Sequence, residues 1–458
     1  MKYPAILLSA CMSLFISTYT NAQEAVINKS GNENKANPVN EFSISAQIRP
    51  RFEYRNGAYK PLQNGEAPAI LTHNRTRLVM DYANEDKLRF RISAQNVNVW
   101  GQDAQVVPIN ASSGNFSVFE AYGDIKLSNT MRTKIGRQVI SLDDERIFGG
   151  LDWHPAGRSH DALNISWKNN KAVEVQSYFA YNQNYKATGW NVNNPVGQFY
   201  TPADAQPYQH MQLLYGKFNV SGTSYISVLL NNLGFKKDAI TNGSVAAAKV
   251  HNMQTAGANW FGNYGKWKSQ LSAFYQGGKN ADGKDKSAYM LSGSAGYQVS
   301  QPVGIALGAD YLSGDDYGAA NNDESRYFDP LYGTHHKFYG FMDYYYVAGP
   351  NTVGLLDTYM SLSLKPGIKA DFGIAGHLFN AAGTIYNGSD KLSSGLGSEI
   401  DLTFNYKVLP MVTINGGYST YFHTATLRTI KTTPDARGYQ DWFWLSVNIN
   451  PKIFTARF

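Results

Sequence analysis

The sequence predicts an all-β protein: a transmembrane antiparallel β-barrel of about 18 strands, with short periplasmic turns and long extracellular loops. Three observations predict it. Apolar and polar side chains alternate with a period of two along many segments. The connections between these segments alternate between short and long, and the composition is rich in aromatic residues and poor in charge.

The composition fits a membrane β-structure better than an average soluble domain. Aromatic residues make up 14% of the 458 residues and charged residues 17%, and charge in an average soluble chain is about 25%. The formal net charge of +6 is mild, so no nucleic-acid partner is expected. Cys11 is the single cysteine, which excludes an intramolecular disulfide and a cysteine-based metal site.

The first residues predict export. An apolar stretch over residues 5–16 follows Lys2, and small or polar residues lead to Ala22, so residues 1–22 are interpreted as a signal peptide cleaved after Ala22. The alternative is a lipoprotein signal ending at Cys11, but the apolar stretch continues past that cysteine. Export with a barrel predicts the outer membrane of a Gram-negative type of cell.

The rest of the chain divides into two parts. Residues 23–40 are rich in Asn, Glu and Lys, and we expect them to form a flexible N-terminal extension. Residues 41–458 are expected to form the barrel. After the signal, no stretch approaches the about 18 apolar residues that a membrane helix requires.

Alternation identifies the strands. From Phe42 to Arg55 the even positions are almost all apolar, and the odd positions carry Ser, Gln, Arg or Glu; residues 399–408 repeat the pattern. A period of two means a strand with one apolar and one polar face. Pro50 cannot donate to a ladder, so we expect a bulge or a strand end there.

The spacing of the strands predicts the architecture. Short connections of two to four residues alternate with long ones, the longest being residues 315–352. We expect this loop on the outer surface, folding partly over the mouth, because it has too many aromatic residues for a freely solvated tip. An even strand number returns both ends of the barrel to the short-turn rim. We expect strands near 42–55, 70–83, 87–100, 115–127, 130–140, 160–168, 172–183, 208–220, 223–234, 249–261, 266–278, 287–300, 303–314, 353–365, 368–381, 395–408, 411–423 and 441–450.

A membrane explains why such a sheet closes. In lipid every backbone amide needs an internal partner, and a sheet achieves this only without edges. The aromatic surplus would form girdles against outer-membrane lipid. The terminal Phe458 is similar to the signal that barrel-assembly machinery reads, so that machinery is an expected partner during biogenesis.

Arginine is concentrated in one part of the chain. Eleven of the 15 arginines lie between Arg49 and Arg158. Residues i and i+2 share a face, and neighbouring strands lie about 4.8 Å apart, so three consecutive strands would form one basic wall facing the lumen. We call this set the arginine wall: Arg49, Arg51, Arg75, Arg77, Arg89 and Arg91.

Two interpretations of the arginine wall are open. It is a substrate path for an anionic solute, since arginine binds carboxylates bidentately. Alternatively, Glu53, Asp81, Glu120 and Asp124 pair with the arginines and only stiffen the barrel. Both hold if the pairing is incomplete.

A block of the sequence resembles the signature of the alginate-export family of outer-membrane porins. It runs from Gly136 to Trp153 and continues with Arg158 and Asp161. Residues 328–343 are similar to a long late loop of that family, and the likeness extends over residues 42–458. The signature residues are Gly136, Arg137, Gln138, Glu145, Arg146, Asp152, Trp153, Arg158 and Asp161.

The resemblance implies an 18-stranded porin that passes an anionic oligo- or polysaccharide, an alginate-like polyuronate, through a basic lumen. The alternative is a specific or general porin for small carboxylates or other acidic solutes. A barrel-embedded hydrolase is a minor alternative, because no Gly-x-Ser-x-Gly elbow occurs, and we expect no enzyme activity.

Metal and cofactor sites are not expected. The acidic part of the longest loop, residues 315–329, contains oxygen ligands of the kind that calcium prefers, but their spacing matches no calcium-loop template. His335 and His336 are adjacent, so their side chains point apart and no further ligand is evident.

Overall fold

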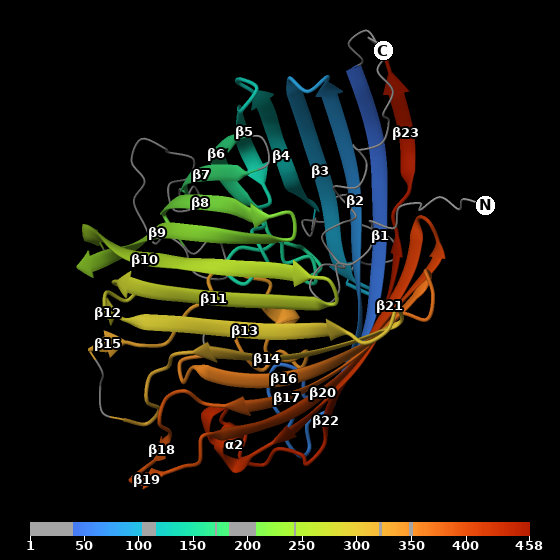
Figure 1. Ribbon diagram of the computed structural model, residues 1–458. Helices are drawn as coiled ribbons and strands as arrows, with labels where there is room; N and C mark the ends of the chain where they lie inside the picture. The colour runs from blue at the N-terminus through green and yellow to red at the C-terminus, as the bar shows by residue number, and fades with distance from the viewer. Residues whose placement is uncertain are drawn as a thin grey trace.

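The computed structural model describes residues 40–102, 116–169, 172–182, 208–241, 244–319, 323–347 and 351–458. These residues form a closed antiparallel β-barrel of 18 strands (Figure 1). The predictions for residues 1–22 and 23–39 lie outside the described residues.

Each strand pairs with its neighbour in sequence, and the first strand pairs with the last. The barrel strands are β1 (Asn40–Asn56), β2 (Ala69–Asn84), β3 (Leu88–Val99), β4 (Phe116–Lys126), β5 (Met131–Gln138), β6 (His160–Asn169), β7 (Val173–Tyr181), β8 (His210–Ser221), β9 (Ser224–Thr241), β10 (Ser244–Tyr264), β11 (Trp267–Gly278), β13 (Ala288–Gln298), β14 (Val303–Leu312), β16 (Leu355–Leu364), β17 (Ala370–Asn380), β20 (Gly395–Leu409), β21 (Val412–His423) and β22 (Gln440–Ile449).

The barrel closes along β1. One edge of β1 pairs with β2 from Asn40 to Arg55. The other edge pairs first with β22 and then with β23 (Lys452–Arg457), which together form one interrupted strand. This interruption explains why 19 hydrogen-bonded segments make a barrel of 18 strands.

The remaining elements are small and lie in the connections. β12 (Asp285–Lys286) pairs in parallel with β15 (Glu324–Ser325), and β18 (Tyr386–Asn387) pairs with β19 (Asp390–Lys391). A 3-10 helix, η1, covers His335–Lys337, and α2 covers Ala425–Ile430.

Among the described residues, no helix is both long enough and apolar enough to cross a membrane.

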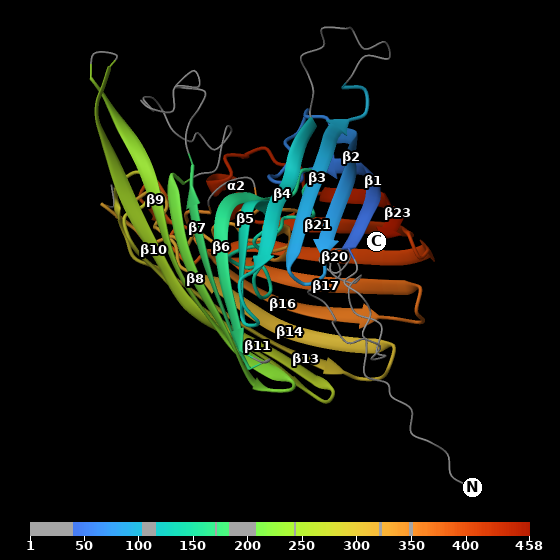
Figure 2. The ribbon, with the colours of Figure 1, turned by 90° about the horizontal axis from the view of Figure 1, so that it is seen from above.

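All 18 predicted strands are present, with two differences in detail. The hairpin of β9 and β10 continues in register to Thr241 and Ser244, beyond the predicted strand ends near 234 and 249. It rises past its neighbours in Figure 2. Pro50 neither ends nor bulges β1, so this prediction is wrong: the residue pairs with Asn74, and its carbonyl accepts the Ser446 hydroxyl at 3.1 Å. The irregularity falls instead between Ile44 and Ser45.

The two faces of the wall differ as the alternation predicts. On β1 to β3, apolar residues such as Ile48, Leu78 and Phe90 face outward and are almost half exposed. Their sequence neighbours Arg77 and Arg91 face the interior and are buried. An apolar outer surface and a polar inner surface are what a membrane barrel requires.

The buried aromatic core lies inside the lumen rather than in the wall. Two connections fold inward and supply much of it: the β5–β6 loop (residues 139–159) and the described parts of the β14–β16 loop (residues 313–319, 323–347 and 351–354). Within the latter, the aromatic residues near η1 are buried, as their number predicts, but they lie inside the lumen rather than over its mouth. They are Tyr332, Phe338, Tyr339, Tyr344, Tyr345 and Tyr346.

Candidate functional site

The two inward loops meet in the lumen and hold each other. Phe148 and Tyr332 form an isolated parallel β-bridge. The amide of Gly149 donates to the Tyr332 carbonyl at 2.9 Å, and the Tyr332 amide donates to the Ile147 carbonyl at 3.0 Å. Arg158 donates to the carbonyl of Gly333 at 3.0 Å. The loops therefore form one constriction.

The β5–β6 loop has an unusual backbone. Asp143, Glu145 and Leu151 all have positive φ angles, of 52°, 71° and 50°. Non-glycine residues rarely adopt this conformation, and the strain persists only where surrounding contacts impose it. Here Asp143 accepts hydrogen bonds from Tyr215 at 2.8 Å and Ser227 at 2.7 Å, both on the barrel wall.

The same loop places a carboxylate on the arginine wall. Asp152 forms ion pairs with Arg75 at 2.8 Å, Arg49 at 3.1 Å and Arg77 at 3.7 Å. Burial alone would raise the pKa of Asp152, but the charges of Arg75, Arg49 and Arg77 outweigh it and hold that pKa well below its ordinary value. Asp152 is therefore a charged internal ligand of the wall.

Backbone carbonyls of the loop extend this contact. Arg51 donates to the carbonyl of Trp153 at 2.7 Å, and Arg77 donates to that of Ala156 at 3.0 Å. Arg49 also reaches the carbonyl of Asp152 at 2.8 Å. The Asp152 carboxylate and three backbone carbonyls of the loop thus bind four of the six arginines.

The other two arginines pair within the wall. Asp81 accepts from Arg91 at 2.8 Å and Arg89 at 3.1 Å, and Glu120 lies 3.5 Å from Arg91. Arg89 is the most exposed of the six, at 31%, whereas Arg75 is 1% exposed.

The predicted ion pairs with the arginine wall are present for three of the four carboxylates. Glu53 pairs with Arg51 at 2.7 Å, and Asp81 and Glu120 pair as described above. Asp124 pairs with Arg132 at 2.9 Å, outside the arginine wall. The substrate path along these arginines stays a prediction.

An acidic wall lies on β14 to β20, and β21 and β22 separate it from β1 of the arginine wall. Asp310, Asp357, Glu399 and Asp401 are all buried on β14, β16 and β20, and His377 on β17 lies 3.0 Å from Asp357. The β14–β16 loop packs on this wall. The two loops therefore lie between a wall rich in arginine and a wall rich in carboxylates within one lumen.

Specific bonds fix the loop to the acidic wall. The amide of Met342 donates to Glu399 at 2.7 Å, and the hydroxyls of Tyr345 and Tyr421 lie 2.7 Å apart. Arg146 bridges the assembly, because it pairs at 2.8 Å with both Asp144 of its own loop and Asp310 of the wall.

Most of the signature block comes together at this constriction. Trp153 stacks on His336 with ring centroids 3.7 Å apart. The side-chain amide of Gln138 donates to the Ala162 carbonyl at 2.8 Å, and the Glu145 carboxylate accepts from the Ser141 hydroxyl at 2.7 Å.

Three signature residues are separate from it. Gly136 lies on β5 and pairs with Tyr122 of β4. Arg137 and Asp161 form a bidentate pair, at 2.9 and 2.8 Å, on the same face as the exposed Ile135. They therefore lie on the outer face of the barrel rather than in the lumen.

The sequence reasoning missed several residues of the constriction. The alternation of polar and apolar residues along β20 places Glu399 and Asp401 on the inward face. The neighbouring sequence gives no sign that a distant loop will cover them. The indole rings of Trp442 and Trp444 surround Trp153, at centroid distances of 6.0 and 4.8 Å. Only the folding of distant segments brings these rings together.

Among the described residues no group of three or more His, Cys, Asp or Glu is placed to hold a metal ion. The acidic part of the longest loop uses its carboxylates locally: Asp316 accepts the Thr384 amide at 2.6 Å, and Glu324 pairs with Arg326 at 2.9 Å. His336 pairs with Asp343 at 2.8 Å.

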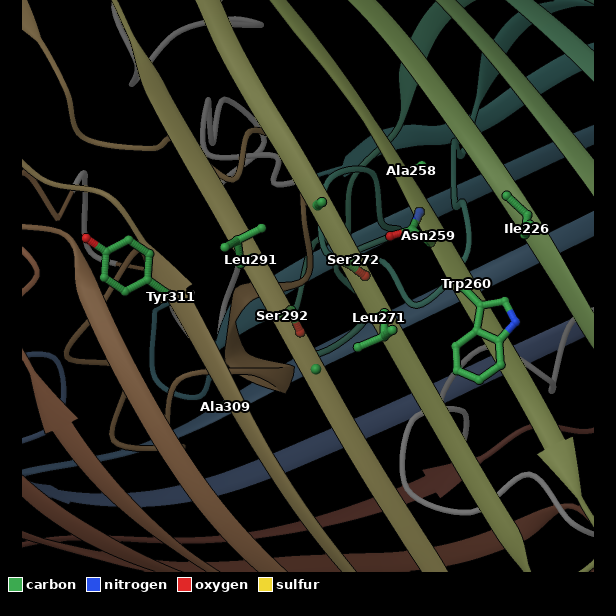
Figure 3. A pocket seen from close by; sticks show the side chains of 12 residues that line it. Ile226, Ala258, Asn259, Trp260, Leu271, Ser272, Leu291, Ser292, Ala309 and Tyr311 are labelled. Atoms are coloured by element: carbon green, nitrogen blue, oxygen red, sulfur yellow. The ribbon is translucent and has the colours of Figure 1, made fainter.

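A separate hollow lies on the outer wall formed by β9 to β14 (Figure 3). Small side chains such as Ala258 and Ala309 floor it, and Leu271 and Leu291 project beside them. It measures about 520 Å³ and is almost wholly apolar. Because it belongs to the lipid-facing surface, it contributes nothing to the lumen.

A closed 18-strand barrel with an apolar outside and a constricted polar lumen defines the class of outer-membrane porins. Within that class, the chain belongs to the alginate export family, whose model matches residues 40–439. No curated protein sequence matches the chain.

Solved porins of Pseudomonas aeruginosa share the fold. OprD superposes with a TM-score of 0.58 at 10% identity, covering 90% of this chain and 94% of OprD. OccD3 (OpdP) gives 0.58 at 10% identity, covering 90% and 92%. OpdK with vanillate gives 0.56 at 10% identity, covering 89% and 98%.

Proposed function

We propose that this porin passes an anionic oligo- or polysaccharide, an alginate-like polyuronate, along the arginine wall. The observation that carries the proposal is the contact with Asp152. Arg49, Arg75 and Arg77 already bind one carboxylate, and Arg51 and Arg77 bind neutral oxygens beside it. A uronate unit offers the same groups, a carboxylate flanked by neutral oxygens.

Arginine suits this task chemically. Its guanidinium remains charged at every physiological pH and binds carboxylates in a planar, bidentate geometry. Membership of the alginate export family supports the same solute class. A carboxylate of the solute would replace the Asp152 carboxylate on these arginines. Binding would therefore exchange one carboxylate for another.

A second candidate, a porin for small carboxylates, has its own support. The inward loops narrow the lumen, and a structural neighbour, OpdK, was solved with vanillate, an aromatic carboxylate. The stacked rings of Trp153 and His336 beside Arg51 would accommodate an aromatic acid. No chemistry beyond passage is proposed for either solute.

Single-channel recording separates the candidates. Oligogalacturonate should block the ion current at concentrations where maltodextrin of equal length does not. Benzoate-type acids should not block if the channel prefers the polymer. Arg49→Gln combined with Arg89→Gln should weaken the block by the oligouronate.

Arg137→Gln provides the matched control. This arginine belongs to the same signature block but forms its ion pair on the outer face, so the block should not change. If the oligouronate blocks the current no better than maltodextrin does, the polyuronate is not the solute. If both variants lose the block equally, the arginines act through folding rather than by binding the solute.

A further inference from the structure

We infer that β22 carries a ring-binding subsite beside the arginine wall, and that Trp153 of the β5–β6 loop occupies it in the structure. The subsite consists of the inward indoles of Trp442 and Trp444 and the guanidinium of Arg51 on β1. Its ligand is the pyranose or aromatic ring of a cyclic carboxylic acid. The inference rests on the proposed function, because the carboxylate of that solute replaces Asp152 on the arginines.

The alternation of β22 places both indoles in the lumen. Trp442 and Trp444 are 1% and 4% exposed, whereas Phe443 between them faces lipid. In the register of the barrel, Trp444 lies opposite Glu53 of β1 on one side and Gly417 of β21 on the other. The indoles therefore border β1, the first strand of the arginine wall.

Gly417 leaves the space that the Trp444 ring occupies. A Cβ at Gly417 would lie 2.4 Å from Nε1 of Trp444, so a side chain there would displace the indole. The glycine at this inward position of β21 thus shapes one side of the subsite.

Both indole N–H groups of the subsite lack an acceptor. Nε1 of Trp442 and Nε1 of Trp444 are buried and have no hydrogen-bond partner among the described residues. A buried tryptophan N–H usually finds a partner, and leaving a buried donor unsatisfied costs free energy. The Trp153 ring cannot supply an acceptor, because an indole N–H only donates. A sugar in its place brings hydroxyl oxygens, which accept.

Trp153 is held on several sides. Its ring stacks on that of His336 with centroids 3.7 Å apart, and the Arg51 guanidinium lies 4.0 Å from its centroid. Trp444 meets it edge-on at 4.8 Å. Trp153 itself is only half-buried, unlike the two indoles of the wall. It therefore covers the subsite from the side of the lumen.

Asp152 and Trp153 together resemble a uronate. One residue places a carboxylate on three arginines of the wall, and the next places a ring among aromatic side chains. The loop holds this pair at a cost, because Leu151 just before it has a φ of 50°. A uronate chain, with carboxylates on pyranose rings, meets both sets of groups. An open-chain acid meets only the arginines, so the subsite selects cyclic acids.

The test compares galacturonate, a cyclic acid, with gluconate, an open-chain acid of the same charge, as blockers of the single-channel current. In the wild type, galacturonate should block at about tenfold lower concentration. Trp444→Leu should remove this preference and leave the gluconate block unchanged. Trp153→Ala should lower the blocking concentration of galacturonate further, because it removes the internal competitor.

Trp260→Leu, on the lipid-facing wall of β10, is the matched control and should block like the wild type. Opposite effects of Trp153→Ala and Trp444→Leu are the result expected, because a cluster that only packs would be weakened by both. Trp153→Ala alone still tests the inference if Trp444→Leu fails to fold.

Equal block of the wild type by the two acids would overturn the subsite. If oligogalacturonate still blocks in that case, the proposed function stands without it. If neither galacturonate nor oligogalacturonate blocks, the proposed function fails and the subsite fails with it.

Discussion

The buried charges of the constriction depend on one another. Arg146 is 2% exposed and is the shared cation of Asp144 and Asp310, which are 3% and 1% exposed. Removing one partner of a buried ion pair costs about 3–5 kcal/mol, because the remaining charge stays buried without compensation. Arg146→Met should therefore destabilise the barrel by about that amount, measured by urea unfolding in detergent.

Arg326→Met is the control for this measurement. Arg326 also pairs with an acid, but on the surface, where water replaces the partner at little cost. It should unfold like the wild type. Equal unfolding of the two variants would contradict the importance assigned to Arg146.

Asp152 sets how much positive charge the arginine wall presents. Its carboxylate neutralises part of the charge of Arg49, Arg75 and Arg77. Asp152→Asn keeps the shape and removes the charge, so the anion preference should rise, with a larger reversal potential in a KCl gradient. Asp161→Asn, on the outer face, should leave the reversal potential unchanged.

His335 makes the β14–β16 loop sensitive to acid. Burial, with a smaller contribution from Arg158, lowers the pKa of His335, against the raising effect of the Tyr346 carbonyl. The undocked loop would titrate near about 6.5, so it binds more protons than the docked loop as pH falls through that value. Docking should weaken below about pH 6.5, seen as faster hydrogen exchange in residues 335–347 after correction for intrinsic rates.

His335→Gln should remove this response. The glutamine amide can still donate to the Tyr346 carbonyl, to which His335 now lies at 2.9 Å, but it does not titrate. The same acid sensitivity in the variant would assign the effect to another group.

At the scale of elements, the alternation of polar and apolar residues predicts strands well, because a lipid-facing position tolerates few side chains other than apolar ones. The ends of β9 and β10 were missed for the same reason: beyond the membrane the alternation is no longer imposed. The sequence predicted that the β14–β16 loop folds partly over the mouth, but not that it enters the lumen and packs on β20 and β21. Its aromatic residues indicate burial, but their partners, such as Tyr421 and Glu399, are far away in sequence.

The β4–β5 pair contains a position that only glycine fits. Gly136 has a φ of 119°, and a Cβ there would lie 2.2 Å from the carbonyl oxygen of Ala121. Gly136→Ala should destabilise the barrel by about 1–3 kcal/mol, measured by urea unfolding. Gly123, on the neighbouring strand, has nothing within 4 Å of its Cβ position, so Gly123→Ala should be nearly neutral.

The topology of the whole molecule can be tested with two insertions. Gly388 and Gly367 both have open space around them, on the long-loop and the short-turn rim. A peptide tag at Gly388 should be accessible to antibody on intact cells. A tag at Gly367 should be reached only after the outer membrane is opened, and the reverse result would invert the proposed orientation.

Maturation remains a prediction from the sequence alone. We expect the mature chain to begin at Gln23, because Ala22 and Thr20 are small enough for signal peptidase. Intact-mass measurement on protein from purified outer membranes decides this. A lipid-modified terminus at Cys11 would contradict it.

Closure along β1 also has a kinetic consequence. The contact of Glu41 with Arg457 joins residues 416 positions apart, and every other strand pair is local by comparison. Such non-local pairing forms slowly, because a long chain must be brought together before any bond compensates its lost entropy. Until then β1 and β22 are open edges, ready to pair with another chain. Delayed closure should therefore produce edge-to-edge aggregates, which makes the final seam the step where assistance during biogenesis matters most.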